Sequence, residues 1–192
     1  MFKISNRSEI QPFIVMDVMR AANERAAIGN DVIHLEVGQP NSCAPTKVLE
    51  MAKSTLNTDK LGYTDALGTI VLKERIAKYY FDAYGVNIEL ERIVITTGSS
   101  GGLALSFLSS FDVGDHVGLA TPGYPAYKNM LKALGINVLE IAVDSSSRFQ
   151  LTKEILQSQS KKLDGLIISS PSNPTGSMIS SQNLNNLANW CE

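Results

Sequence analysis

The chain has 192 residues, of which 44% are hydrophobic and 19% are charged, and its formal net charge is -2 at pH 7. This composition is typical of a soluble globular protein and excludes a strongly basic nucleic-acid-binding domain. No apolar run approaches the ~20 residues that span a bilayer, and the polar N-terminus has no signal-peptide core. Cys43 and Cys191 fit no metal-ligand spacing. We therefore expect a cytoplasmic protein with reduced thiols that binds no metal, nucleic acid or membrane.

The N-terminal part of the sequence predicts helices joined by polar loops. Apolar residues recur at helical spacing from about 13 to 28, where a Gly-Asn pair supplies a stop. Residues 32–37 predict a short strand. A second helix is expected at 45–56, because proline is favoured at a first helical position. A third is expected at 69–84, with a glycine just past its end.

Strands and helices alternate in the rest of the chain. Strands are expected at 92–97, 116–120, 138–143 and 166–168. Helices are expected at 103–110, from the loop at 121–125 to about 134, at 152–157, and from 184 to the chain end. This alternation favours a mostly parallel sheet with crossover helices.

The first candidate site is the glycine-serine segment 98–102, expected as a turn between a strand and a helix. Such a turn presents backbone N–H groups and the positive end of the helix to an anion. Ser99 and Ser100 add hydroxyl donors, and Gly98 lets a phosphate approach the backbone. The segment lacks the endings of the P-loop and of the dinucleotide fingerprint. Taken alone, a tight structural turn explains it equally well.

Two further loops follow neighbouring strands. Tyr124 lies in a Pro-Gly-Tyr-Pro segment, and its ring is able to stack on a planar ligand. Taken alone, the residue is better explained as a tyrosine that covers the edge of the hydrophobic core. Asn173 lies past the strand at 166–168, and the prolines and glycine around it preset its amide. Ligands of parallel sheets bind at the carboxyl ends of the strands. A planar, phosphorylated heteroaromatic cofactor therefore fits all three loops.

Two N-terminal loops complete the set of candidates. Gly38 stands in Val-Gly-Gln-Pro, where a substrate could reach the main chain, and Tyr63 is exposed on the polar loop 61–68. Each has a plain turn as its alternative.

Five motifs in this order resemble class I/II aminotransferases that depend on pyridoxal 5'-phosphate (fold type I, the aspartate aminotransferase-like superfamily). They occupy 37–40, 62–68, 96–102, 122–127 and 172–176. The resemblance implies an α/β fold, namely the three-layer α/β/α, mostly parallel sheet of the large domain, truncated, with an N-terminal segment of the small domain. Residues 1–45 would form the N-terminal arm and part of the small domain. Residues 46–192 would form an incomplete large, cofactor-binding domain.

The resemblance also implies how the cofactor is held. Gly98, Ser99 and Ser100 would hold the phosphate of pyridoxal 5'-phosphate, and Tyr124 would stack on its pyridine ring. Asn173 would hydrogen-bond the phenolic oxygen and lie at the substrate site.

The N-terminal motifs extend this picture. Gly38 resembles the glycine near the substrate carboxylate. Tyr63 resembles a tyrosine that reaches the phosphate bound by the partner subunit of a homodimer. Each active site would then need both subunits.

The residues that carry out the chemistry in the family have no counterpart in this chain. The Schiff-base lysine, the aspartate at the pyridine nitrogen and the arginine for the substrate carboxylate come later in the family, and no residue up to Glu192 matches them. We therefore expect the N-terminal half of a transaminase for an amino acid and a 2-oxo acid, with no catalytic residue of its own and inactive alone. The alternatives are a C–S lyase or decarboxylase of the same fold, or a non-catalytic phosphate-binding or dimerisation module.

Overall fold

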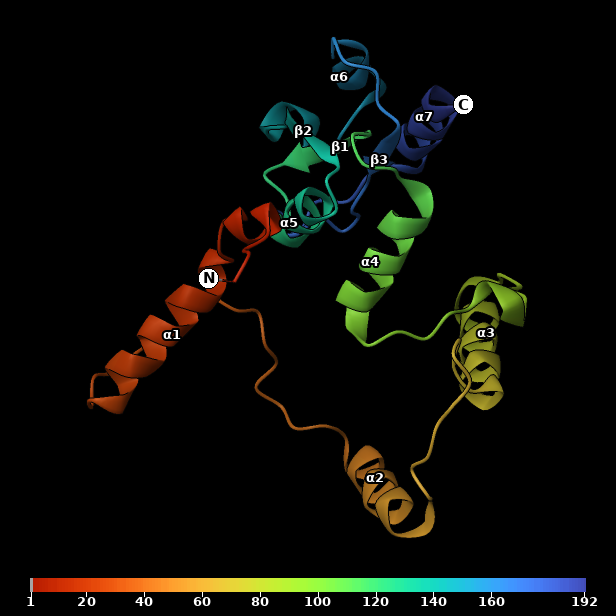
Figure 1. Cartoon of the computed structure of the whole chain (residues 1–192). Helices are drawn as coiled ribbons and strands as arrows, with labels where there is room; N and C mark the ends of the chain where they lie inside the picture. Colours follow the sequence, from red (N-terminus) through yellow and green to blue (C-terminus); the bar gives the residue numbers. More distant parts are fainter. Residues whose placement is uncertain (1) are drawn as a thin grey trace. The chain divides into compact units, whose positions relative to one another are not determined.

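A computed structural model describes residues 2–192 (Figure 1). The contacts within the chain divide it into two units. The helical unit comprises Ile14–Gly102. The sheet unit combines the residues up to Phe13 with Leu103–Glu192. Helix α4 (Gly98–Ser110) begins in the first unit and continues into the second.

The sheet unit is built on three parallel strands. In the order β2-β1-β3, they are β2 (Asn137–Ala142), β1 (His116–Thr121) and β3 (Gly165–Ile167). These bounds confirm the strands expected at 116–120, 138–143 and 166–168 to within about two residues. The parallel pairing confirms the sheet type expected from the alternation of elements.

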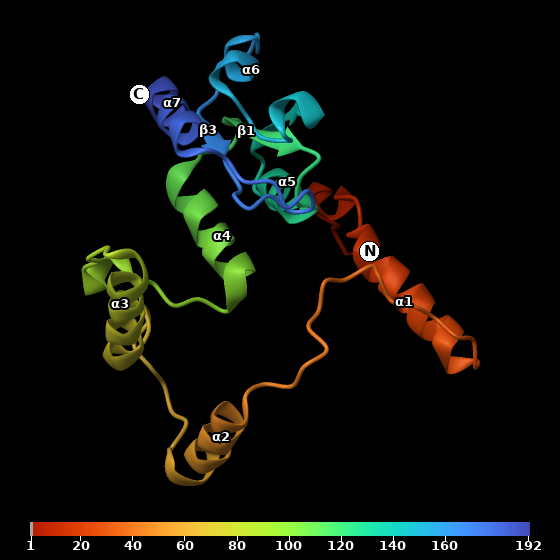
Figure 2. The ribbon, with the colours of Figure 1, turned by 180° about the vertical axis from the view of Figure 1, so that it is seen from behind.

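Helices cover both faces of this sheet. On one face, Val117 and Leu119 of β1 pack with Phe107 of α4 and Leu131 of α5 (Pro125–Ala133). On the other, Ile141 of β2 packs with helices α6 (Lys153–Gln157) and α7 (Ser181–Cys191), through Leu156 and Leu187. Figures 1 and 2 both show α5 and α6 on opposite sides of the strands. The predicted three-layer α/β/α arrangement is therefore present in the sheet unit.

Local capping signals explain where these helices begin. Pro125 occupies the first turn of α5, where its missing N–H costs nothing. The Ser180 hydroxyl accepts a hydrogen bond of 3.2 Å from the backbone N–H of Asn183 at the start of α7. The Thr152 hydroxyl does the same for Ile155 in α6, at 3.4 Å.

The helical unit contains the three helices expected from the sequence. They are α1 (Ile14–Ala27), α2 (Thr46–Thr58) and α3 (Ile70–Tyr84). None of their residues is buried. Residues 2–192 also contain three short 3-10 helices: η1 (Asn6–Glu9) and η3 (Ser145–Ser147) in the sheet unit, and η2 (Leu90–Arg92) in the helical unit.

Two predicted strands are wrong. Residues 32–37 and 92–97 form no strand, and the second segment begins within η2. The reason is that an extended segment forms a strand only when it is hydrogen-bonded to a neighbouring strand. The Ile95 N–H, for example, donates 3.1 Å to the carbonyl of Leu67 in a loop. Apolar runs alone therefore overpredicted strands here.

The predicted turn at 98–102 is also wrong, because these residues form the first turns of α4. Gly98 has φ = +75°, a left-handed conformation that other residues rarely adopt, and the helix runs on from it. Helical geometry then continues through Ser99 and Ser100 without a break.

Other expectations from the sequence have mixed outcomes. Cys43 and Cys191 are both free and exposed. Across residues 2–192, no helix combines the length and apolar character needed to cross a membrane. The domain boundary at residue 45 stays a prediction.

We predict that Leu187→Ala destabilises the sheet unit by about 2–5 kcal/mol, because Leu187 is fully buried against Ile141 and Leu156. Leu184→Ala is the matched control on the same helix, since the Leu184 side chain is 46% exposed and its removal leaves no enclosed cavity. Chemical denaturation monitored by circular dichroism would measure both. Equal losses in the two variants would contradict the packing described for α7.

Candidate functional site

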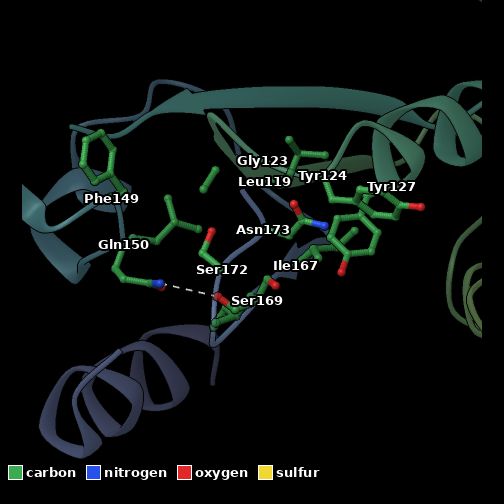
Figure 3. A pocket seen from close by; sticks show the side chains of 13 residues that line it. Leu119, Gly123, Tyr124, Tyr127, Phe149, Gln150, Ile167, Ser169, Ser172 and Asn173 are labelled. Atoms are coloured by element: carbon green, nitrogen blue, oxygen red, sulfur yellow. Dashed lines mark hydrogen bonds between the residues drawn. The ribbon is translucent and has the colours of Figure 1, made fainter. Parts of the chain in front are cut away.

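The loops that follow β1 and β3 form a pocket at the carboxyl edge of the sheet (Figure 3). Leu119 and Ile167 supply apolar walls, and Ser169, Ser172 and Asn173 add polar groups. The space inside is about 30 Å³, enough for a water molecule. A larger ligand would therefore lie across the open side of the pocket.

Tyr124 and Asn173, 49 positions apart in the chain, both line this pocket. Figure 3 shows them on the same side of it, away from Phe149 and Gln150. The sequence predicted that these two loops meet at one sheet edge, and the structure brings them together. Their roles toward a ligand stay predictions.

Two aromatic rings hold Tyr124 in place. Its ring meets Phe13 at a centroid distance of 5.9 Å and an interplanar angle of 85°, and meets Tyr127 at 5.4 Å and 84°. Edge-to-face pairs of this kind are favourable and orient the ring. No local sequence pattern indicates the role of Phe13, which lies 111 positions before Tyr124.

Gly123 allows this loop to turn back on β1. A Cβ atom at position 123 would overlap the backbone carbonyl oxygen of Ala120. The contact is with backbone, so no side-chain rotation relieves it. A side chain at this position would therefore force the backbone of the loop that carries Tyr124 to shift.

Hydrogen bonds within residues 172–177 close the Asn173 loop. The Ser172 N–H donates 2.9 Å to the carbonyl of Ser177, and the Gly176 N–H donates 2.7 Å to the carbonyl of Ser172. Asn173 itself stays exposed at the tip of this closed loop. The loop is thus ordered by its own backbone, which leaves the Asn173 side chain available to a ligand.

Gln150 also lines the pocket, although it lies in none of the sequence motifs. Its side chain is only 5% exposed, and it reaches the Asn173 loop from the segment after β2. A single glutamine carries no sequence signal of burial. Only the tertiary structure reveals it.

An acidic turn precedes Gln150. One carboxylate oxygen of Asp144 accepts hydrogen bonds from the Ser146 hydroxyl at 2.6 Å and from the Ser146 N–H at 2.8 Å. These bonds, with that of the hydroxyl as the larger cause, lower the pKa of Asp144 below its ordinary value. The charged carboxylate therefore stabilises the turn η3.

The glycine-serine segment lies in the helical unit. Ser99 and Ser100 are exposed in the first turn of α4, where backbone N–H groups have no acceptor within the helix. The Thr96 hydroxyl donates 2.8 Å to the carbonyl of Gly98 and fixes the entry to the helix. A helix N-terminus with two hydroxyls is suited to a phosphate. That it meets Tyr124 and Asn173 stays a prediction.

Tyr63 and Gly38 also lie on loops of the helical unit. Tyr63 is fully exposed, and Gly38 is exposed with open space where a Cβ would stand. Just before Gly38, His34 Nδ1 lies 2.7 Å from Glu36 Oε1, and this hydrogen bond is the main cause that lowers the pKa of Glu36. The roles of Gly38 and Tyr63 stay predictions.

The pocket residues suit a flat aromatic ligand with a hydrogen-bonding edge. Tyr124 supplies a ring, Asn173 an amide that both donates and accepts, and the strand ends an apolar wall. In the described part of the chain, no buried side-chain nitrogen or oxygen lacks a hydrogen-bond partner. The site is therefore internally satisfied and offers its polar groups at the open side.

Comparison with known proteins identifies the family. Residues 30–192 match the family model described as aminotransferase class I and II. The chain is 43% identical over 190 residues to a valine–pyruvate aminotransferase of Mycobacterium tuberculosis, covering 99% of this chain and 49% of that protein. It is 36% identical over 171 residues to a (5-formylfuran-3-yl)methyl phosphate transaminase of Methanocaldococcus jannaschii, covering 88% and 44%.

Solved structures agree with the sequence relatives. An aminotransferase from Mycobacterium tuberculosis superposes with a TM-score of 0.95 at 43% identity, over 100% of this chain and 49% of that one. The aspartate aminotransferase of Thermus thermophilus with maleate superposes with a TM-score of 0.91 at 26% identity, over 99% and 50%. The fold and the motifs thus define a protein of the aminotransferase type.

The chain belongs to the aminotransferase class I and II family. It spans about half the length of the relatives it matches. The resemblance expected from the five motifs is therefore confirmed at the level of family and fold.

We predict that Gly123→Ala destabilises the sheet unit by about 1–3 kcal/mol, because the new methyl group overlaps the Ala120 carbonyl. Tyrosine fluorescence and thermal unfolding would report the displaced ring and the lost stability. Gly62→Ala is the control, since a Cβ there meets nothing within 4 Å. A Gly123→Ala protein as stable as Gly62→Ala would refute the close approach.

We predict that the Asp144 carboxyl titrates below its ordinary pKa of 3.8, and that Ser146→Ala raises its midpoint toward that value. Because the folded-state pKa is lowered, the contribution to stability is present above pH 3.8 and disappears as the pH falls through the folded-state midpoint. Carboxyl-carbon NMR shifts against pH would measure the midpoint. Ser145→Ala is the control, and an equal shift in that variant would contradict the assigned cause.

Proposed function

We propose that this chain contributes the cofactor-binding half of an amino acid:2-oxo acid transaminase that uses pyridoxal 5'-phosphate. The observation that carries the proposal is the pocket shared by Tyr124 and Asn173, in a chain of the aminotransferase class I and II family. Because the chain spans about half of its relatives' length, the activity is proposed for a whole protein of their length.

The proposed roles follow from the chemistry of each side chain. Tyr124 stacks on the pyridine ring, where its edge contacts with Phe13 and Tyr127 keep it oriented. Asn173 donates its amide N–H to the phenolic oxygen and lies at the substrate site. Bound pyridoxal phosphate supplies an electron sink for bond breaking at the α-carbon of the amino acid. The residues described here bind and orient it.

The phosphate site is proposed on the first turn of α4. Gly98 opens the helix, and Ser99 and Ser100 offer hydroxyl and amide donors to the phosphate oxygens. Tyr63, fully exposed, is proposed to reach the phosphate of the partner subunit in a homodimer. Gly38 is proposed to lie beside the substrate carboxylate.

Transamination is favoured over lyase or decarboxylase chemistry because the relatives named above are an aminotransferase and a transaminase. Valine with pyruvate is the first substrate pair to assay, by analogy with the 43% identical relative. In the whole gene product, a transaminase consumes the 2-oxo acid in step with the amino acid. Product release without consumption of the 2-oxo acid would instead indicate a lyase or a decarboxylase.

We predict that Tyr124→Ala weakens binding of pyridoxal 5'-phosphate to the whole protein about tenfold, through loss of ring stacking. We predict a similar loss for Asn173→Ala, because the phenolic oxygen loses a hydrogen-bond donor. Fluorescence titration of the cofactor-free protein measures both. Tyr124→Phe keeps the ring and should bind normally, and Asn185→Ala on the exposed side of α7 is the matched asparagine control. Unchanged affinity for pyridoxal 5'-phosphate in both alanine variants would refute the proposed cofactor site.

Residues 1–192 alone are proposed to be inactive, because no lysine among them stands in the family motif that binds the cofactor covalently. The purified chain should form no amino acid from a 2-oxo acid acceptor. Transamination by this chain, free of host enzymes, would overturn the proposal.

A further inference from the structure

The buried polar residues of the structure gather at the Asn173 loop. Within residues 2–192, the polar residues that reach burial are Gln150, at 5% exposure, and Ser172, at 9%. Burying an amide is costly unless it is hydrogen-bonded. Gln150 lies outside all five motifs, so a role in the site is not implied by them.

The Gln150 side chain is hydrogen-bonded to this loop through its NH₂ group. Its Nε2 donates 2.8 Å to the carbonyl of Ser177 and 3.1 Å to the Ser177 hydroxyl. The carbonyl of Ser169 lies at the longer distance of 3.5 Å, drawn as the dashed line in Figure 3. Because carbonyl oxygens surround this end of the side chain, it must be the donor NH₂ that faces them.

Ser177 connects Gln150 to Asn173. The carbonyl of Ser177 accepts one hydrogen bond from Gln150 and another from the N–H of Ser172. The second bond closes the loop that carries Asn173 at its tip. Gln150 therefore anchors, from the pocket interior, a carbonyl oxygen that accepts one of the two hydrogen bonds closing the loop.

The backbone before Gln150 is held in a special conformation. Arg148 and Phe149 have φ of +55° and +56°, in the left-handed region that non-glycine residues rarely occupy. The Phe149 N–H donates 2.7 Å to the carbonyl of Asp144, and this turn carries the chain into the pocket. Such conformations persist where surrounding contacts determine them.

We propose that Gln150 is the positioning residue of the cofactor site: it orients the Asn173 amide toward the phenolic oxygen of pyridoxal 5'-phosphate by pinning Ser177. The inference rests on the proposed function, and it adds a residue that the family motifs leave out. Gln150 touches neither cofactor nor substrate in this scheme. It acts through the backbone of the loop.

The test compares the whole gene product with its Gln150→Met, Asn173→Ala and double variants. Methionine matches the length of glutamine and has no donor. The first readout, amide hydrogen exchange at Ser172 and Gly176, does not depend on the cofactor. We expect exchange there to accelerate about tenfold in Gln150→Met, because the loop loses a buried hydrogen-bond partner, with helix α7 unchanged. The matched control is Gln157→Met, an exposed glutamine on α6.

The second readout is the dissociation constant of pyridoxal 5'-phosphate, measured by fluorescence titration of the cofactor-free proteins. If Gln150 acts through Asn173, Gln150→Met weakens binding several-fold, and the double variant binds no more weakly than Asn173→Ala alone. Additive losses would show an independent effect and overturn the proposal.

Gln150→Glu keeps the test decisive if methionine disturbs folding. The new carboxyl has the shape of glutamine, donates a hydrogen bond when protonated and repels the Ser177 carbonyl when charged. After correction for intrinsic exchange, loop protection should fall as the pH rises through the pKa of this carboxyl. Protection that does not vary with pH in Gln150→Glu, or is unchanged in Gln150→Met, refutes the anchoring.

The outcomes also separate this proposal from the proposed function. Normal cofactor affinity in Asn173→Ala would refute the cofactor contact itself, and the inference with it. Weakened affinity in Asn173→Ala but normal affinity in Gln150→Met would refute the positioning role alone.

Discussion

The alternation of side chains along β1 decides where the pocket lies. Val117 and Leu119 enter one hydrophobic cluster, while Ala120 packs against the other, so both faces of the strand are covered by helices. There is no room for a side chain at Gly118, because a Cβ atom there would lie 2.8 Å from the Leu163 side chain. A central strand held on both faces has a fixed carboxyl end. The loops that follow this end therefore start from a rigid strand, which holds their binding residues in defined positions.

The two loops at this edge are supported in different ways. Tyr124 is held by aromatic edges from Phe13 and Tyr127, which constrain the ring and leave the loop backbone to turn at Gly123. The Asn173 loop is held by two backbone hydrogen bonds, from Ser172 to Ser177 and from Gly176 to Ser172, and by the Gln150 side chain, which donates to Ser177. Aromatic packing orients a surface for stacking, whereas hydrogen bonds orient an amide. Each support thus matches the chemistry of the group that it positions.

The helical unit presents the opposite situation. Its helices α1, α2 and α3 carry exposed apolar side chains, among them Val48, Met51 and Leu56 on α2. Apolar surface on this scale favours contact with further protein. The family relatives are about twice as long as this chain, and the enzyme is proposed to be a homodimer. Contact with the rest of a protein of that length, or with a partner subunit, would cover these apolar side chains. Tyr63, proposed to serve a partner subunit, lies in this same unit.

By itself the sequence determined the family, the parallel sheet at 116–168, most helices and the two loops that share the pocket. Periodicity, capping residues and proline-glycine segments are local, and such signals survive without knowledge of neighbours. It wrongly predicted strands at 32–37 and 92–97, because apolar runs do not reveal whether a pairing partner exists. Only the tertiary structure decided that Phe13 packs on Tyr124 and that Gln150 is buried beneath the Asn173 loop. These contacts join residues remote in the chain, and no local pattern encodes a remote partner.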